Sequence, residues 1–358
     1  MYIHIVNSGE HIEGLERRFS MKRGSITHLN GLADPARLTS GLALGLPAAV
    51  KAPLQRRELW LGSTAPLSDS MLRSIAHESS FILLPGLSIS AGGLPEILPA
   101  LSDQAETAGA AGAVPVLRLS APDSLTAHTL LRDEGAVQLL TASLSEQLSS
   151  GKWGGLLLDL PTLPAFDREY YSTFIHHISQ ALHAAGINLA ISVELFEGNF
   201  DGFQDLRTLC DFCDRILLLP PLSSGRFEAP AFDEGRLRAP LEAVLRDVPA
   251  EKCLLLCPAT GWDWAGNGTK KPISMSTAAD TACALGARIY FDQAAKSPYF
   301  DYRDPTGLRH RVWFEDIRSL GSRCAMAEEY GLAGLAIEDC VHLSPPGLEL
   351  LCQRLDPL

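Results

Sequence analysis

Acidic residues end several short apolar runs of this sequence, where buried strands would end. Asp159 closes the run within WGGLLLDLPTL and is followed two residues later by Pro161. Glu194 ends NLAISVE, and Glu338 ends GLAIE. Carboxyl groups at the carboxyl ends of parallel strands are well placed for general acid–base chemistry or for binding polar ligands. These acids are therefore the candidate chemical groups of the chain.

The elements that would position these acids are eight short, continuous apolar runs separated by amphipathic or alanine-rich segments. This pattern is typical of parallel strands that are covered on both faces by helices. It predicts an α/β fold, a (β/α)₈ TIM barrel, over residues 57–358, with its chemistry at the carboxyl ends of the strands. The runs are LWLG (59–62), FILLPGL (81–87), VPVLRL (114–119), GLLLDL (155–160), NLAISVEL (188–195), RILLLPP (215–221), CLLLC (253–257) and GLAGLAI (331–337).

The regular spacing is broken after the seventh run, because the interval from Trp264 to Tyr330 is too long for one crossover helix. Aromatic alternation and turn signals in this interval predict a small α+β insertion at about residues 268–315. Such an insertion would form one wall of a groove. Trp262 and Trp264, which flank Asp263, are candidates for stacking on sugar rings there. The alternative is that these rings pack in the core of the insertion.

Residues 1–47 have a separate pattern, with strand-like alternation in YIHIV, helical spacing in IEGLERRF and SITHLN, and a closing strand before Pro47. The order β-α-α-β predicts a small module of its own, joined to the barrel by a linker at residues 48–56. The pattern resembles the LysM module. The matching residues are Tyr2, Gly9-Glu10-His11, Ile26 to Asn30, Leu38, Gly41, Leu44 and Pro47.

The resemblance to LysM implies binding of N-acetylglucosamine-containing glycans such as peptidoglycan, in a groove between two loops. Glu10-His11 stand where the module usually has Asp-Thr, which keeps an acid for capping the helix but removes a hydroxyl. The simpler interpretation is that Gly9 and Asp34-Pro35 only form turns. The loop residues are Ser8, Gly9, Glu10, His11, Gly31, Leu32, Ala33, Asp34 and Pro35.

The barrel segments resemble glycoside hydrolase family 18, notably the LysM-bearing glycosidases of spore-forming bacteria that act on spore cortex peptidoglycan. The residues that carry this resemblance are GWDW (261–264), AKSPYFDYRDPTGLRHRVWFEDIRS (295–319) and EEYGLAGLA (328–336). The family carries D-x-x-D-x-D-x-E at its fourth strand. The final Glu is the general acid, and the preceding Asp orients the 2-acetamido group that acts as the nucleophile.

This chain keeps one of the four motif acids, because Gly154, Leu157, Asp159 and Pro161 align with them. Proline cannot donate a proton. At the sixth strand, Pro221 and Leu222 replace a Tyr and an Asp that hold the acetamido group, and Glu338 replaces the tryptophan on which the sugar stacks. The motif is therefore degenerate.

Three interpretations follow. The first is a catalytically inactive family 18-like protein that binds N-acetylglucosamine glycan in the spore envelope. The second is an active peptidoglycan- or chitin-type glycosidase in which Glu338 or Glu194 is a relocated acid. The third is a scaffold for spore-coat proteins with no affinity for glycans. A barrel mouth that is open and lined by acids and aromatic rings would favour hydrolysis, whereas a mouth plugged by Leu and Pro would favour inactivity.

Composition limits the other classes of partner. A net charge of −12 disfavours binding to nucleic acid or to anionic membranes. We expect no cofactor and no metal, although the pairs Cys210/Cys213 and Cys253/Cys257 leave a four-thiolate site as the alternative to buried core cysteines. The N-terminus has no basic region followed by an apolar one, which predicts cytoplasmic synthesis without a signal peptide. The resemblance implies a final location at the spore coat or cortex surface.

Overall fold

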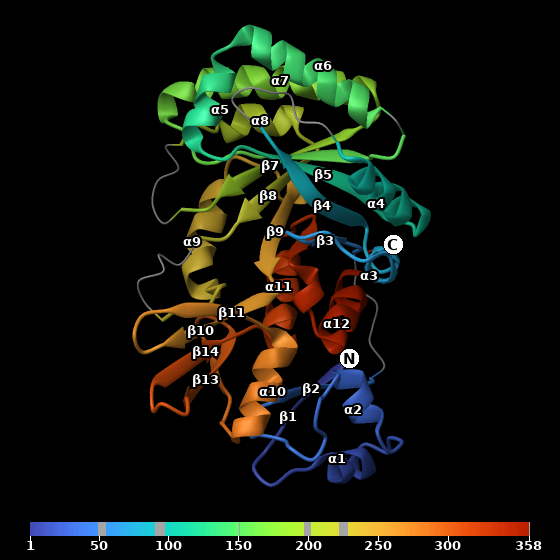
Figure 1. Cartoon of the computed structure of the whole chain (residues 1–358), viewed down its shortest axis with the longest axis vertical. Helices are drawn as coiled ribbons and strands as arrows, with labels where there is room; N and C mark the ends of the chain where they lie inside the picture. Colours follow the sequence, from blue (N-terminus) through green and yellow to red (C-terminus); the bar gives the residue numbers. More distant parts are fainter. Residues whose placement is uncertain (49–54, 90–96, 150, 197–201, 222–227, 358) are drawn as a thin grey trace.

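The computed structural model describes residues 1–48, 55–89, 97–149, 151–196, 202–221 and 228–357. Eight parallel strands close a barrel in the order β15-β3-β4-β5-β6-β7-β8-β9 (Figure 1). Each strand coincides with one of the eight apolar runs, so the prediction of a TIM barrel is confirmed. The strands are β3 (Glu58–Gly62), β4 (Phe81–Ser88), β5 (Val114–Ser120), β6 (Gly155–Asp159), β7 (Asn188–Glu194), β8 (Arg215–Leu219), β9 (Cys253–Pro258) and β15 (Gly334–Glu338).

The strands are mostly apolar because both of their faces are buried, and their acids lie at or near the carboxyl ends. Leu156 and Leu158 point outward to the helices, whereas Leu157, between them, belongs to the cluster inside the barrel. Figure 1 shows the helices around the outside of the strands. They are α3 (Asp69–Ala76), α4 (Pro99–Ala110), α5 (Ser124–Leu131), α6 (Glu134–Leu148), α7 (Arg168–Ala184), α8 (Leu206–Phe212), α9 (Glu234–Val244), α11 (Ile317–Glu329) and α12 (Pro345–Leu355), with short 3₁₀ turns at Ala165–Asp167, Ala250–Lys252 and Cys340–His342.

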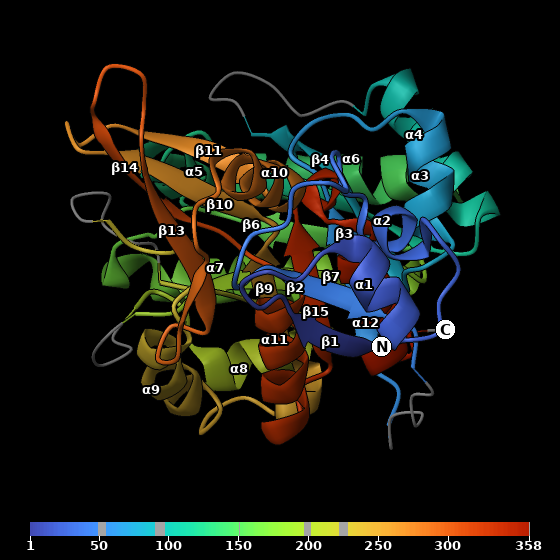
Figure 2. The same ribbon diagram turned by 90° about the horizontal axis from the view of Figure 1, so that it is seen from below.

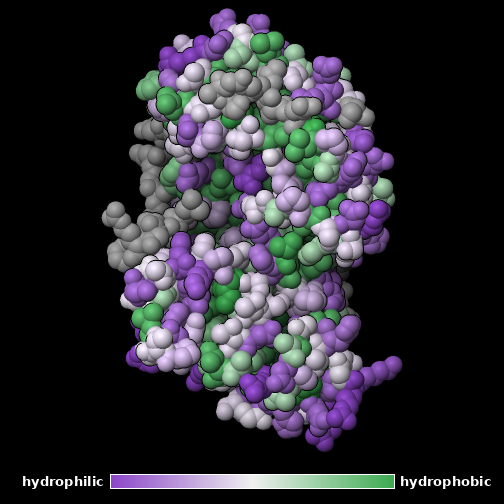
Figure 3. Space-filling model, viewed as in Figure 1, coloured by the Kyte–Doolittle hydropathy of each residue, from purple (hydrophilic) through white to green (hydrophobic). Residues whose placement is uncertain are grey.

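The insertion follows β9, the seventh barrel strand, and forms an antiparallel sheet in the order β11-β10-β14-β13-β12. The sheet includes β10, which precedes the predicted start near residue 268, and a helix separates β11 from β12. The molecular face in Figure 3 carries scattered apolar patches between polar ones. The elements of the insertion are β10 (Thr260–Ala265), β11 (Lys270–Ser274), α10 (Met275–Leu285), β12 (Tyr290–Asp292), β13 (Ser297–Arg303) and β14 (Arg309–Trp313).

Residues 1–46, the N-terminal unit, have the predicted order β1 (Tyr2–Ile5), α1 (Ile12–Arg18), α2 (Ser25–Asn30) and β2 (Ala43–Leu46). The two strands pair antiparallel. Figures 1 and 2 show this unit against α10 and α12, and its apolar side chains form one cluster with those of the insertion. The Thr39 hydroxyl donates to the Ala287 carbonyl at 2.7 Å, and the Ile289 N–H donates to the Ser40 carbonyl at 2.9 Å. Residues 49–54 of the predicted linker lie outside the described residues.

The side chain of Asn30 connects helix α2 to strand β2 inside the N-terminal unit through hydrogen bonds. Its side-chain amide donates to the carbonyls of Ile26 at 2.8 Å and Gly45 at 3.0 Å, and its oxygen accepts from the Gly45 N–H at 2.7 Å. The residue is 8% exposed. Buried backbone groups need such partners, so this asparagine gives the I-x-x-x-N spacing of the sequence a structural reason.

We expect Asn30→Ala to lower the free energy of unfolding by about 2 kcal/mol or more, because it leaves the buried N–H and C=O of Gly45 without partners. Urea unfolding followed by circular dichroism measures the change. Asn7→Ala is the matched control, because Asn7 is exposed and its side chain makes only 3.5 Å hydrogen bonds. An equal loss in both variants would show that Asn30 has no special role.

A buried ionic network joins α9, the insertion and α11. Arg323 is fully buried, and its guanidinium lies 3.2 Å from Glu234, 3.3 Å from Glu315 and 3.9 Å from the centre of the Phe232 ring. Burial raises the pKa of Glu315 from 4.5 to about 7, although Arg323 opposes this change. The folded protein therefore keeps the Glu315 proton over a pH range in which the unfolded chain has released it.

The network predicts a dependence of stability on pH. A carboxyl whose pKa is raised by folding contributes stability that is complete below about pH 4.5 and is lost as the pH rises to about 7. We expect Glu315→Gln to reduce this loss, because the amide does not titrate. Urea midpoints measured at pH 4.5, 6 and 7.5 for both proteins provide the comparison, and parallel curves would contradict the prediction.

Candidate functional site

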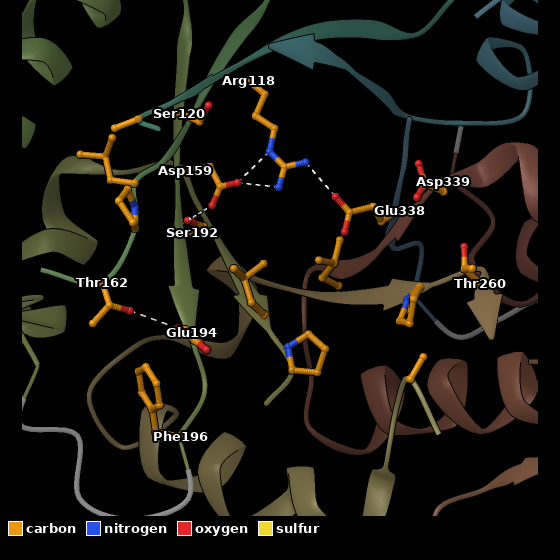
Figure 4. A pocket seen from close by; sticks show the side chains of 18 of the residues that line it. Arg118, Ser120, Asp159, Thr162, Ser192, Glu194, Phe196, Thr260, Glu338 and Asp339 are labelled. Atoms are coloured by element: carbon orange, nitrogen blue, oxygen red, sulfur yellow. Dashed lines mark hydrogen bonds and ion pairs between the residues drawn. The ribbon is translucent and has the colours of Figure 1, made fainter. Parts of the chain in front are cut away.

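An open pocket lies at the carboxyl ends of the barrel strands, where the acids were expected (Figure 4). Its volume is about 690 Å³. The mouth is therefore open and not plugged, although prolines and leucines form part of its wall, and by the criterion given above an open mouth with acids and aromatic rings favours hydrolysis. The lining residues used below are Arg118, Asp159, Pro161, Thr162, Ser192, Glu194, Phe196, Trp262, Lys270, Glu338 and Asp339.

Arg118 joins Asp159 and Glu338 at one side of the pocket (Figure 4). Its Nε donates to Asp159 Oδ2 at 2.7 Å, and its Nη1 donates to Glu338 Oε1 at 2.8 Å. The Ser192 hydroxyl donates to Asp159 Oδ1 at 2.6 Å. Burial opposes the charge of Arg118, but Asp159 and then Glu338 raise its pKa above the ordinary value. Both carboxyl groups thus have strong partners within the protein.

Sequence reasoning missed Arg118. The run VPVLRL was interpreted as an apolar strand, and its single arginine was not singled out. The missed signal is chemical: an arginine within a strand that is covered on its outer face must place its charge near acids in the barrel interior or mouth. Asp159 and Glu338, already identified at strand ends, are those acids.

Glu194 is in a different environment. The Thr162 hydroxyl donates to its Oε2 at 3.1 Å, and within the part of the chain that the structure describes it forms no ion pair. Figure 4 shows Glu194 away from the Arg118 cluster, with Phe196 just beyond it along the chain. Glu194 is therefore the pocket acid with the weakest internal partner.

The remaining motif positions do not restore an acid. Pro161 lines the pocket two residues after Asp159. Leu157 is fully buried inside the barrel, and Gly154 precedes β6 at the opposite end of that strand. Leu222 lies outside the described residues. In the described part of the fourth-strand motif, Asp159 is the one carboxyl group.

The two tryptophans of GWDW differ in position. Trp262 lines the pocket, and the ammonium group of Lys270 lies 4.1 Å from the centre of its ring. Trp264 is 2% exposed, and its indole N–H donates to the Ala229 carbonyl at 3.0 Å, so it belongs to the core. Asp263 accepts from the Tyr302 hydroxyl at 2.8 Å and contacts His310 Nδ1 at 2.8 Å. We keep Trp262 as the candidate sugar platform.

The candidate loops of the N-terminal unit are mostly exposed. Glu10 accepts from the Asn7 N–H at 2.8 Å and contacts His4 and Arg18, and the Asn7 hydrogen bond is the main cause that lowers its pKa. Helix α1 is instead preceded by His11, whose side chain makes no capping hydrogen bond. The expectation that Glu10 caps this helix is therefore wrong, because its carboxylate closes the preceding turn.

The second loop, Gly31 to Pro35, is exposed except for partly buried Leu32. The Ala33 N–H donates to Asp280 on α10 at 3.3 Å. Asp34 accepts from the Ala36 N–H at 2.9 Å, as in a simple turn. This loop therefore contacts the insertion as well as solvent.

The cysteines are buried or half-buried and form no disulfides. Burial raises the pKa of Cys213 and of Cys253 to about 12, which disfavours the thiolate that metals bind. Among the described residues, no group of three or more His, Cys, Asp or Glu side chains is arranged to hold a metal ion. Within those same ranges, no helix is long and apolar enough to cross a membrane.

Comparison with known proteins finds relatives that are named for sporulation and for the spore cortex. The chain is 24% identical over 414 residues to the Bacillus subtilis protein named "Putative sporulation-specific glycosylase YdhD", covering 98% of each chain. It is 27% identical over 220 residues to the cortical fragment-lytic enzyme of B. subtilis, covering 58% of this chain and 51% of that enzyme. No family model matches the chain.

Solved structures agree on the fold. The spore cortex-lytic enzyme SleL of Bacillus megaterium superposes with a TM-score of 0.78 at 18% identity, over 98% of this chain and 86% of that one. A chitinase from Chromobacterium violaceum superposes with a TM-score of 0.74 at 22% identity, over 83% of this chain and 99% of that one. The chain is homologous to the sporulation glycosylase and the cortical fragment-lytic enzyme, and its barrel is chitinase-like.

Proposed function

We propose that this protein binds an N-acetylglucosamine-containing glycan of the spore envelope in its barrel pocket and does not hydrolyse it. The relatives named above as a sporulation glycosylase and a cortex-lytic enzyme support a glycan of the spore as the ligand. The open pocket with half-buried Trp262 on its wall supports binding, because an aromatic ring on a pocket wall can stack on a sugar. The N-terminal unit acts as a LysM-type module that adds a second contact with the glycan.

The observation that carries the absence of hydrolysis is the state of the pocket acids. By the resemblance to family 18, Pro161 aligns with the proton donor, and it lines the pocket, while Arg118 holds Asp159 and Glu338 through charged hydrogen bonds. A general acid must present a proton to the leaving oxygen. Glu338 is already engaged with Arg118 through Oε1, which argues against its use as a relocated acid.

The test uses purified full-length protein with insoluble spore peptidoglycan and with soluble N-acetylglucosamine oligomers. We expect the protein to sediment with peptidoglycan and to release no reducing ends above the rate of a heat-denatured sample. Release of reducing ends that disappears in Glu338→Gln or Glu194→Gln would replace this proposal with an active glycosidase. Failure to sediment would favour a scaffold for coat proteins.

A second candidate function is glycoside hydrolysis with Glu194 as the acid. One observation favours it: Glu194 faces the pocket with a threonine hydroxyl as its partner and no ion pair among the described residues. Glu194→Gln separates the two candidates, because the change removes a proton donor while keeping the shape of the side chain. Loss of at least about 100-fold in rate is expected for an acid catalyst.

A further inference from the structure

The charges of the described residues that line the pocket do not balance. These residues include four carboxyl groups and two cations, so their formal charge at pH 7 is −2. A cavity of one sign with low-dielectric walls concentrates ligands of the opposite sign. The carboxyl groups are those of Asp159, Glu194, Glu338 and Asp339, and the cations are Arg118 and Lys270.

Among the described lining acids, Glu194 and Asp339 have no cationic partner, and they differ in their hydrogen bonds. Arg118 is shared by Asp159 and Glu338, and Asp339 accepts from the backbone N–H and the hydroxyl of Thr64 at 3.0 and 2.7 Å. Glu194 accepts one hydrogen bond, from the Thr162 hydroxyl, and has no cationic partner in the described part of the chain. A charged donor on a ligand would therefore find its best acceptor at Glu194.

The neighbourhood of Glu194 suits a small cation. Phe196 follows two residues later, lines the same pocket and is 43% exposed. An ammonium group beside a carboxylate and an aromatic ring gains both an ion pair and attraction to the ring face. The pocket thus provides the two groups that recognise a primary amine.

Asp159 is a poor acceptor for the N–H of a ligand's acetamido group. Its Oδ2 accepts from Arg118 at 2.7 Å, and its Oδ1 accepts from Ser192 at 2.6 Å. An amide N–H of a ligand would therefore compete with a guanidinium and a hydroxyl for this carboxylate. At Glu194 a neutral amide N–H would donate to a charged acceptor, but it would lack the ion pair that an ammonium group adds.

We infer that the pocket selects a hexosamine with a free, protonated 2-amino group over the N-acetylated sugar. The ammonium group pairs with Glu194, and the sugar ring lies within reach of Trp262. The ligand class is accordingly a partly deacetylated aminoglycan, which still contains N-acetylglucosamine beside the free amino sugar. This inference rests on the proposed function, since it names the sugar that the same pocket binds.

Isothermal titration calorimetry of the full chain at about pH 6 tests the inference with two ligands, the glucosamine tetramer and the N-acetylglucosamine tetramer. We expect the glucosamine tetramer to bind about 10-fold more tightly. Glu194→Gln should weaken its binding about 10-fold, as expected for loss of one charge-assisted contact, and should leave the acetylated tetramer within about 2-fold. The amide variant assigns the signal to the pocket, because the N-terminal unit is unchanged.

Glu106→Gln is the matched control for net charge. Glu106 is 67% exposed, lies on α4 and pairs with Lys152 at 3.0 Å. The Glu106→Gln variant should bind both tetramers with the same affinity as the unaltered protein. Tighter binding of the acetylated tetramer, or an unchanged affinity in Glu194→Gln, would overturn the inference and leave glycan binding intact. Binding of neither tetramer, together with no sedimentation on peptidoglycan, would overturn both.

Discussion

Deletion of residues 1–47 is expected to destabilise the rest of the chain and to cause aggregation. The N-terminal unit covers apolar side chains of the insertion, including Ile289, Phe300, Val312 and Phe314, which are at most 3% exposed in the intact chain. Exposure of each such side chain costs about 1.5–3 kcal/mol. The total loss for these four side chains is about 6–12 kcal/mol, which is comparable to the stability of a typical domain.

Differential scanning fluorimetry and size-exclusion chromatography of the deletion variant measure this effect. A monomeric variant with an unchanged melting temperature would contradict the prediction, because it would show that the apolar face does not need its cover. Deletion is therefore unsuitable for testing whether the N-terminal unit binds glycans, since it would disturb the barrel side of the interface. Loop substitutions such as His11→Ala and Asp34→Ala are the appropriate test.

A point substitution tests the same interface without deletion. Gly41 has a φ of +90°, and a Cβ atom added there would lie 1.9 Å from the Ile289 carbonyl oxygen. Gly9 has a φ of +82° with nothing within 4 Å of such an atom. Gly41→Ala should therefore lower the melting temperature well below that of Gly9→Ala, which carries the backbone strain alone.

The sequence allowed the barrel to be predicted because continuous apolar runs of four to eight residues have few alternatives when amphipathic helices separate them. It also identified Asp159, Glu194 and Glu338 as mouth residues, since the carboxyl ends of parallel strands meet at one face. These are local patterns. Each depends on residues that are close together in the chain.

The features that were not predicted are long-range ones. The hydrogen bonds of Arg118 reach residues 41 and 220 positions away, so no local pattern shows them. The interface between the N-terminal unit and α10 has the same character. Trp264 illustrates the limit from the other side: its spacing from Trp262 suggested a second ring in the groove, but it lies in the core of the insertion.

Arg118→Met is expected to lower the free energy of unfolding by about 2–4 kcal/mol. Methionine keeps the length of the side chain but leaves Asp159 and Glu338 as partly buried carboxylates without a cation, and loss of one partner of a buried pair typically costs 3–5 kcal/mol. The lower range allows for solvent, since the Arg118 side chain is 23% exposed. Urea unfolding at pH 7 gives the value.

Arg207→Met is the matched control, because Arg207 pairs with Asp247 at 2.6 Å on the surface and is 77% exposed. The Arg207→Met substitution should lower the free energy of unfolding far less than Arg118→Met does, because water screens an exposed ion pair. In the Arg118→Met background, adding Asp159→Asn and Glu338→Gln should recover part of the stability, because the uncompensated charges are then gone. A further loss of stability in the triple variant would show that the two carboxylates are not held in place by Arg118. Arg118 would then be no obstacle to Glu338 acting as a general acid.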